Sequence, residues 1–141
     1  MDRLLIVVGL VAVVALVAVW AQRRRPSAPV RTGYDTPDHL DRGDFDRPEA
    51  PWLVAVFSSA TCAKCAATWE KARHLESADV AVQEIEATVH RELHARYNIE
   101  AVPLIVVVDA EGTRRASFLG PPRTDELWAS MAELRDEDRL G

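Results

Sequence analysis

The stretch Trp52–Cys65, with the sequence WLVAVFSSATCAKC, contains the features that decide the fold. Its first part, Trp52–Ser58, is a continuous apolar run, which is typical of a strand buried on both faces of a sheet. From Cys62 to Glu76, apolar side chains recur every three or four residues, which indicates an amphipathic helix. The only two cysteines of the sequence, Cys62 and Cys65, therefore lie where a buried strand ends and a helix begins.

This placement of the cysteines predicts redox chemistry. A thiol at the start of a helix faces unpaired backbone N–H groups and the positive end of the helix dipole, which lower its pKa. Cys62 is therefore predicted to be the nucleophile, with Lys64 adding a nearby cation. Cys65 lies one turn further on the apolar face, where it can attack a mixed disulfide but is shielded from large substrates. We expect a redox-active Cys62–Cys65 disulfide.

Zinc binding is an alternative for a Cys-x-x-Cys pair, since half-sites for zinc share this spacing. A tetrahedral site would need two further ligands. His90 and His94 are four residues apart and could face the same way on a short helix. The sequence has no second cysteine pair, and the strand-to-helix placement favours redox chemistry, so we expect no metal and no other cofactor. Two inert, packed thiols are the remaining alternative.

Downstream of the cysteines the pattern continues as strand, helix, strand, strand and helix. The predicted strands are Val80–Glu86, Leu104–Asp109 and Arg114–Leu119, and the predicted helices are Val89–Tyr97 and a last one that Thr124 caps. The strands Trp52–Ser58 and Val80–Glu86 are joined by a helix and should be parallel, whereas the turn around Gly112 makes the last two strands a hairpin. The predicted fold class is α/β, with a mixed central sheet and helices on both faces.

This arrangement resembles the thioredoxin family, in the form of a membrane-anchored thioredoxin-like protein of bacterial type. The resemblance covers roughly Trp52 to Leu134. It rests on the strand leading into Cys62-Ala63-Lys64-Cys65, on Val102-Pro103 opening the next sheet strand, and on Gly120 closing the hairpin. It implies the thioredoxin fold and thiol–disulfide oxidoreductase activity.

The resemblance also implies roles for residues around the cysteines. Pro103 would be cis and lie against the dithiol, and Val102 would hydrogen-bond an extended substrate. Thr61 stands where the family has a tryptophan, and we place it with Val102 and Pro103 in the substrate-binding surface. Ala63 and Lys64 replace the usual glycine and proline between the cysteines. Reducing strength therefore does not follow from the resemblance.

A third catalytic residue is suggested by another departure from the family. The family's buried aspartate, a proton carrier beneath the second cysteine, aligns with Val56, and its lysine partner aligns with Glu84. We hypothesise that Glu84 supplies a substitute carboxylate on the same face and serves Cys65 in proton transfer. A solvated glutamate at the strand edge is the alternative reading.

Residues 1–25 are predicted to form a transmembrane anchor with a basic flank. Leu4–Ala21 carries no charge and would span roughly 27 Å as a helix, close to the thickness of a hydrocarbon core. A cleaved signal peptide is the alternative, which the length of the run and the arginines after it disfavour. Arg3 precedes the span, whereas three arginines at 23–25 and Arg31 follow it. The positive-inside rule then places the soluble domain on the cytoplasmic side of the cell membrane.

Residues 26–51 are rich in Pro, Gly, Asp and Arg and are predicted to be a linker, in which Leu40 and Phe45 dock on the domain as a short edge segment. The domain itself is predicted to be 52–141. The formal net charge of the chain is −5, and the part beyond the anchor is more acidic still, which argues against nucleic-acid binding.

The predicted function is thiol–disulfide exchange, through a Cys62 mixed disulfide that Cys65 resolves. Reduction is the favoured direction because the cytoplasm keeps disulfides reduced. The expected partners are a disulfide-containing protein or small thiol and, through Leu4–Ala21, the membrane. The alternatives are a redox-inactive binding module that tethers a partner at the membrane and a carrier of sulfur or metal on the same thiols.

Overall fold

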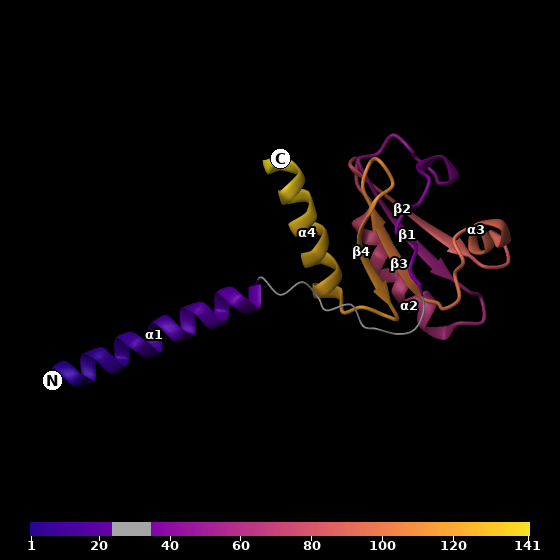
Figure 1. Cartoon of the computed structure of the whole chain (residues 1–141). Coiled ribbons are helices and arrows are strands. Elements are labelled where there is room, and N and C mark those ends of the chain that lie inside the picture. Colours follow the sequence, from indigo (N-terminus) through magenta and orange to yellow (C-terminus); the bar gives the residue numbers. More distant parts are fainter. Residues whose placement is uncertain (24–34) are drawn as a thin grey trace. The chain divides into compact units, whose positions relative to one another are not determined.

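The computed structural model describes residues 1–23 and 35–141 of the chain and separates into two units, Met1–Arg31 and Thr32–Gly141 (Figure 1). Each unit is described by itself. The predicted basic flank at Arg24 and Arg25 lies outside the described residues.

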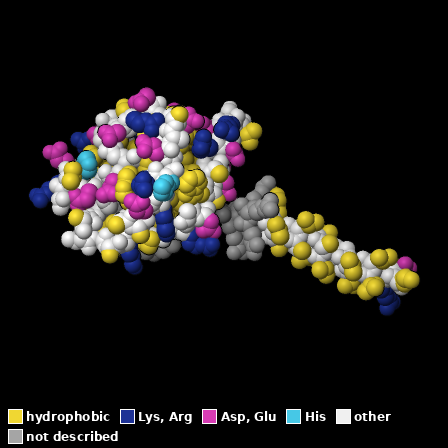
Figure 2. Space-filling model, turned by 180° about the vertical axis from the view of Figure 1, so that it is seen from behind, with side chains coloured by type: hydrophobic (Ala, Val, Ile, Leu, Met, Phe, Trp, Pro, Cys, Tyr) yellow, Lys and Arg dark blue, Asp and Glu magenta, His cyan; other side chains and the backbone are white. Residues whose placement is uncertain are grey.

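The first unit contains helix α1 (Asp2–Arg23). Its large apolar side chains are all exposed, and Figure 2 shows them along the length of the helix. The segment Asp2–Trp20 is long and apolar enough to cross a membrane, by length and composition. This finding agrees with membrane anchoring at the coarse level and leaves the side of the membrane as a prediction.

The second unit is built on one mixed sheet. Its strands are β1 (Trp52–Ser58), β2 (Val80–Glu86), β3 (Leu104–Val108) and β4 (Arg114–Leu119). They lie in the order β2-β1-β3-β4, with β1 parallel to β2 and the other neighbouring pairs antiparallel. Every residue of β1 and β3 is buried, because these two strands occupy the centre of the sheet. The predicted mixed sheet with a terminal hairpin is confirmed.

Helices cover both faces of this sheet, as predicted. On one face lie α2 (Ala63–Ala72), which continues as a 3-10 turn to Leu75, and α4 (Thr124–Leu140). On the other face lies α3 (Arg91–Arg96). Leu93 within this helix and Tyr97 directly after it pack against the core. Helix α3 is shorter than the predicted Val89–Tyr97, because His90, with φ −117° and ψ 50°, is its N-cap residue and Tyr97 is its C-cap residue.

The second half of the predicted linker, residues 26–51, is part of the folded domain in the structure. Leu40, Phe45 and Ala50 are buried in the core around β1 and β3, and His39 forms a β-bridge with Thr113. The expected docking of Leu40 and Phe45 is therefore found, but the folded unit begins well before Trp52. These three apolar residues lie five positions apart, which matches neither the helix period nor the strand period, so the sequence pattern resembles that of a linker.

Asp44 fastens this early segment to α3. Its carboxylate accepts hydrogen bonds from the Tyr97 hydroxyl at 2.5 Å and from the Arg96 guanidinium at 2.6 and 2.7 Å. The bond from Tyr97 and then that from Arg96 lower the pKa of Asp44. The rings of Phe45 and Tyr97 stack at 5.9 Å beside this cluster. These contacts hold residues 38–50 on the domain, and α2 and its cysteines lie on the opposite face of the sheet.

Candidate active site

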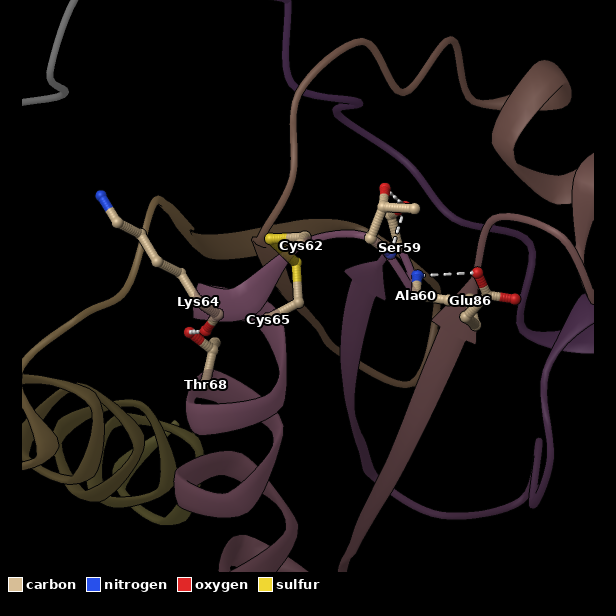
Figure 3. Close-up of a disulfide and its surroundings, with 8 residues drawn as sticks. Ser59, Ala60, Cys62, Lys64, Cys65, Thr68 and Glu86 are labelled. Atoms are coloured by element: carbon tan, nitrogen blue, oxygen red, sulfur yellow. Dashed lines mark hydrogen bonds between the residues drawn. A yellow bond between two sulfur atoms is a disulfide. The ribbon is translucent and has the colours of Figure 1, made fainter.

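The two cysteines lie at the beginning of α2, with their sulfur atoms joined in a disulfide (Figure 3). Cys62 is the N-cap residue of the helix, and its Cα atom lies 5.4 Å from that of Cys65. Cys62 is half-buried, whereas Cys65 is only 2% exposed. Cys62 makes no side-chain capping hydrogen bond in the disulfide form, but its place at the helix N-terminus favours a thiolate after reduction. Cys62, the predicted nucleophile, is thus the more exposed of the two cysteines, and the roles of nucleophile and resolving cysteine stay predictions.

A loop of three residues, 59–61, joins β1 to Cys62, and Glu86 at the end of β2 holds it (Figure 3). One carboxylate oxygen of Glu86 accepts from the backbone N–H of Ala60 at 3.0 Å. The other accepts from the side chain and backbone of Thr88 and from the N–H of Val89. The Thr88 hydroxyl and these backbone groups lower the pKa of Glu86 to about 2. Glu86 is thus an ionised anchor for the loop.

A pocket of about 230 Å³ lies beside the disulfide. Its lining includes Ser58, Cys62, Cys65, Trp69, Glu84 and Glu86. The register of β1 and β2 pairs Val56 with Glu84, so Glu84 lies on the face of the sheet that α2 covers. The structure thereby brings together Cys62, Cys65 and Glu84, the three residues that the sequence predicts to be catalytic.

Glu84 is half-buried, and its carboxylate has no hydrogen bond or ion pair within the described part of the chain. The other two carboxylates at the pocket are engaged. Glu70 forms an ion pair with Arg73 at 2.8 Å, and Glu86 holds the loop. Glu84 is therefore the pocket carboxylate without a partner among the described residues.

The predicted substrate-binding residues lie outside the lining of this pocket. The Val102–Pro103 peptide bond is cis, as the family resemblance implies, and Pro103 is buried directly before β3. Val102 is half-buried, and neither its N–H nor its C=O takes part in a backbone hydrogen bond among residues 35–141. Thr61 is exposed beside Cys62, where its hydroxyl lies 3.1 Å from that of Ser59.

Of the two histidines considered as zinc ligands, His94 packs away from the cysteines. His94 lies on the face of the sheet opposite α2, where its ring packs edge-on to Phe57 and its Nε2 atom lies 2.7 Å from the Ile85 carbonyl oxygen. Within residues 1–23 and 35–141, no group of three or more His, Cys, Asp or Glu side chains is arranged to hold a metal ion.

Ser58 and Glu86 are site residues that the sequence reading missed. They end neighbouring parallel strands and are register partners across the sheet. The available signal was that both strand runs end on a polar residue immediately before a loop. Predicting their meeting requires the register, which the sequence pattern alone leaves undetermined.

The fold and the site together define a thiol–disulfide oxidoreductase of the thioredoxin type, at the level of the family. The family model for thioredoxin matches residues 44–133, which is most of the chain. This chain therefore belongs to the thioredoxin family. A comparison with curated proteins finds no match.

Solved structures of thioredoxins share the fold. The germline-specific thioredoxin Deadhead of Drosophila melanogaster matches with a TM-score of 0.55 and 22% identity, over 72% of this chain and 99% of its own. A mutant thioredoxin from Halobacterium salinarum matches with a TM-score of 0.52 and 23% identity, over 67% of this chain and 89% of its own. At these identities the likeness shows the fold alone.

Proposed function

We propose that this protein is a membrane-anchored oxidoreductase that reduces protein disulfides. The observation that carries the proposal is the unequal exposure of the two sulfurs at the start of α2. Cys62 is half-buried and faces the helix N-terminus, whereas Cys65 is 2% exposed one turn further on. A substrate disulfide can then reach only Cys62, and the resulting mixed disulfide is open to attack only from inside the protein.

The reaction proceeds in two exchange steps. The Cys62 thiolate attacks one sulfur of the substrate disulfide, which forms a mixed disulfide and releases the first substrate sulfur as a thiolate. The Cys65 thiolate then attacks the Cys62 sulfur, which releases the second substrate sulfur and leaves the Cys62–Cys65 disulfide. Two electrons pass to the substrate, whose thiolates take up protons. An external dithiol returns the protein to its reduced form.

Glu84 is proposed to accept the proton of Cys65 in the second step. Cys65 must lose a proton to attack, yet its side chain is 2% exposed. Glu84 lines the same pocket and has no partner within residues 35–141, whereas Glu70 and Glu86 are engaged elsewhere. The pocket that Cys65 and Glu84 both line is large enough to hold water molecules, which makes a proton relay through water feasible.

Thr61, Val102 and Pro103 are proposed to bind the substrate. The free backbone N–H and C=O of Val102 support this role, because an extended peptide can pair with them as an added strand. The expected partner is a disulfide-containing protein or a small thiol, and no nucleic acid. Leu4–Ala21 is proposed to hold the protein in the membrane, with the domain on the cytoplasmic side, on the argument from the flanking arginines.

The proposal is tested by titrating the full chain, in mild detergent, against glutathione redox buffers and by an insulin-reduction assay. We expect a reversible Cys62–Cys65 disulfide and insulin reduction that Cys62→Ser abolishes. Cys65→Ser should accumulate the mixed disulfide. If no reversible disulfide forms, the enzyme reading is wrong and a redox-inactive binding module remains. Carboxy-terminal reporter fusions test the membrane side, and activity only in an extracytoplasmic reporter would contradict the proposed placement.

A further inference from the structure

Ser58 presents a buried hydroxyl group without a hydrogen-bond partner. It is the last residue of β1 and is 2% exposed. Its Oγ atom makes no hydrogen bond within the part of the chain that the structure describes. Its backbone carbonyl is paired with the N–H of Ala87 at 2.9 Å, so only the side chain is unsatisfied. A buried polar group without a partner costs free energy, and such a group calls for an explanation.

The position of Ser58 limits which acceptor it can reach. Side chains alternate along β1, so Ser58 shares the α2 face of the sheet with Val54 and Val56. It lines the pocket together with Cys65. The Glu86 carboxylate, its neighbour across the sheet, already accepts four hydrogen bonds. Glu84 also lines the pocket, as the register partner of Val56, two residues before Ser58. The buried sulfur of Cys65 is the acceptor in this lining whose strength changes when the disulfide is reduced.

The acceptor strength of that sulfur depends on the redox state. In the disulfide, the Cys65 sulfur is neutral and is a weak acceptor. After reduction it is a thiol or thiolate, and a hydrogen bond to an anion is roughly twice as strong as one between neutral groups. Ser58 Oγ makes no hydrogen bond to this sulfur in the disulfide form. Reduction frees the Cys65 sulfur from its bond to Cys62, so that it can shift within the pocket and become a stronger acceptor.

We propose that the Ser58 hydroxyl donates a hydrogen bond to the Cys65 sulfur in the reduced protein and so shifts the dithiol–disulfide equilibrium toward the dithiol. The inference rests on the proposed function, since it requires that the cysteine pair cycles. Ser58 acts here as a positioning residue. It exchanges no electrons and stabilises one of the two states.

In the exchange with glutathione, the hydrogen bond from Ser58 forms when the Cys62–Cys65 disulfide breaks. A glutathione thiolate attacks the Cys62 sulfur, the Cys62–Cys65 bond breaks, and the Cys65 sulfur leaves as a thiolate that accepts from Ser58. A second glutathione thiolate attacks the mixed disulfide, which releases the Cys62 thiolate and oxidised glutathione. Two glutathione molecules supply the two electrons, and solvent supplies the protons that the thiolates take up.

The test measures the equilibrium constant for reduction of the full chain by glutathione in mild detergent. Ser58→Ala should lower that constant about tenfold, which corresponds to a fall in reduction potential of about 30 mV. Ser58→Thr keeps the hydroxyl and should stay close to the unmodified protein. Ser117→Ala removes a hydroxyl from β4, the edge strand that β3 separates from β1. This control should leave the constant unchanged.

Urea unfolding of both redox forms separates this role from simple packing. Ser58→Ala should leave the oxidised form as stable as before or more stable, because it removes an unpaired buried hydroxyl. The reduced form should lose stability. An equilibrium constant within twofold of the unmodified protein, or equal changes in Ser58→Ala and Ser58→Thr, would overturn the inference. A protein that forms no reversible disulfide would instead overturn the proposed function itself.

Discussion

Replacing Glu84 by glutamine should slow the resolution of the mixed disulfide without slowing its formation. The side chain of Cys65 is 2% exposed, so its proton has no direct path to bulk water. A positioned general base contributes about a hundredfold to ten thousandfold. Because the pocket beside Cys65 opens to solvent, water replaces part of this contribution. We therefore expect Glu84→Gln to reduce the resolution rate about a hundredfold at neutral pH, at the low end of that range.

An aromatic disulfide that releases coloured thionitrobenzoate separates the two steps in a stopped-flow experiment. The first release reports attack by Cys62, and the second reports resolution by Cys65. Glu84→Gln should slow only the second phase, and the deficit should shrink as rising pH supplies hydroxide. Glu70→Gln changes a carboxylate at the same pocket that is paired with Arg73, so it is the matched control.

Two outcomes of this experiment would refute the reasoning. An unchanged second phase in Glu84→Gln removes Glu84 from the mechanism. Equal slowing by Glu70→Gln means that the negative charge of the pocket, rather than proton transfer to one carboxylate, controls the rate. In either case the first phase remains a measure of Cys62 alone, so the proposed nucleophile is tested separately.

Three further predictions concern the frame around the site. Glu86→Gln should lower stability to unfolding above about pH 4.5, and the difference from the unmodified protein should fade as the pH falls toward 2, because the pKa of Glu86 is lowered from 4.5 to about 2 in the fold. Tyr97→Phe removes the hydrogen bond to Asp44 and should cost roughly 1 kcal/mol in urea unfolding; no change would show that Arg96 alone holds Asp44. Leu40→Ala should cost roughly 2–5 kcal/mol, since Leu40 is fully buried, and a smaller loss would exclude the segment before β1 from the core.

The sheet could be predicted from the sequence because its central strands leave a simple pattern. Trp52–Ser58 is apolar throughout, since β1 is covered on both faces, and the observed bounds of this strand match the prediction. The helix after Cys62 was equally clear from its period. Leu40 and Phe45 gave no such pattern, because their burial depends on contacts with strands far away in the chain.

The site could be predicted where one residue type in one place carries the chemistry, as with Cys62 and Cys65. Ser58 and Glu86 could not, because their roles come from the register that sets β1 beside β2. Glu84 could be proposed from the family resemblance, because it aligns with the family's lysine, but its freedom from partners could not. That freedom depends on Glu70 pairing with Arg73 and on Glu86 holding the loop, which are three-dimensional contacts.

In this chain the proposed proton acceptor is Glu84 on β2, whereas the family's aspartate aligns with Val56 on β1. This difference in position has a physical consequence for the proposed mechanism. At Val56, in a central strand that is fully buried, a carboxylate would lose its contact with water on both sides. Glu84 occupies the neighbouring position on β2, which is an edge strand, and is half-buried. A proton that Glu84 accepts from Cys65 can therefore pass on to solvent through the pocket. With valine at position 56, the core beside β1 stays apolar. With the carboxylate on its register partner Glu84, the proposed proton acceptor still lines the same pocket as Cys65.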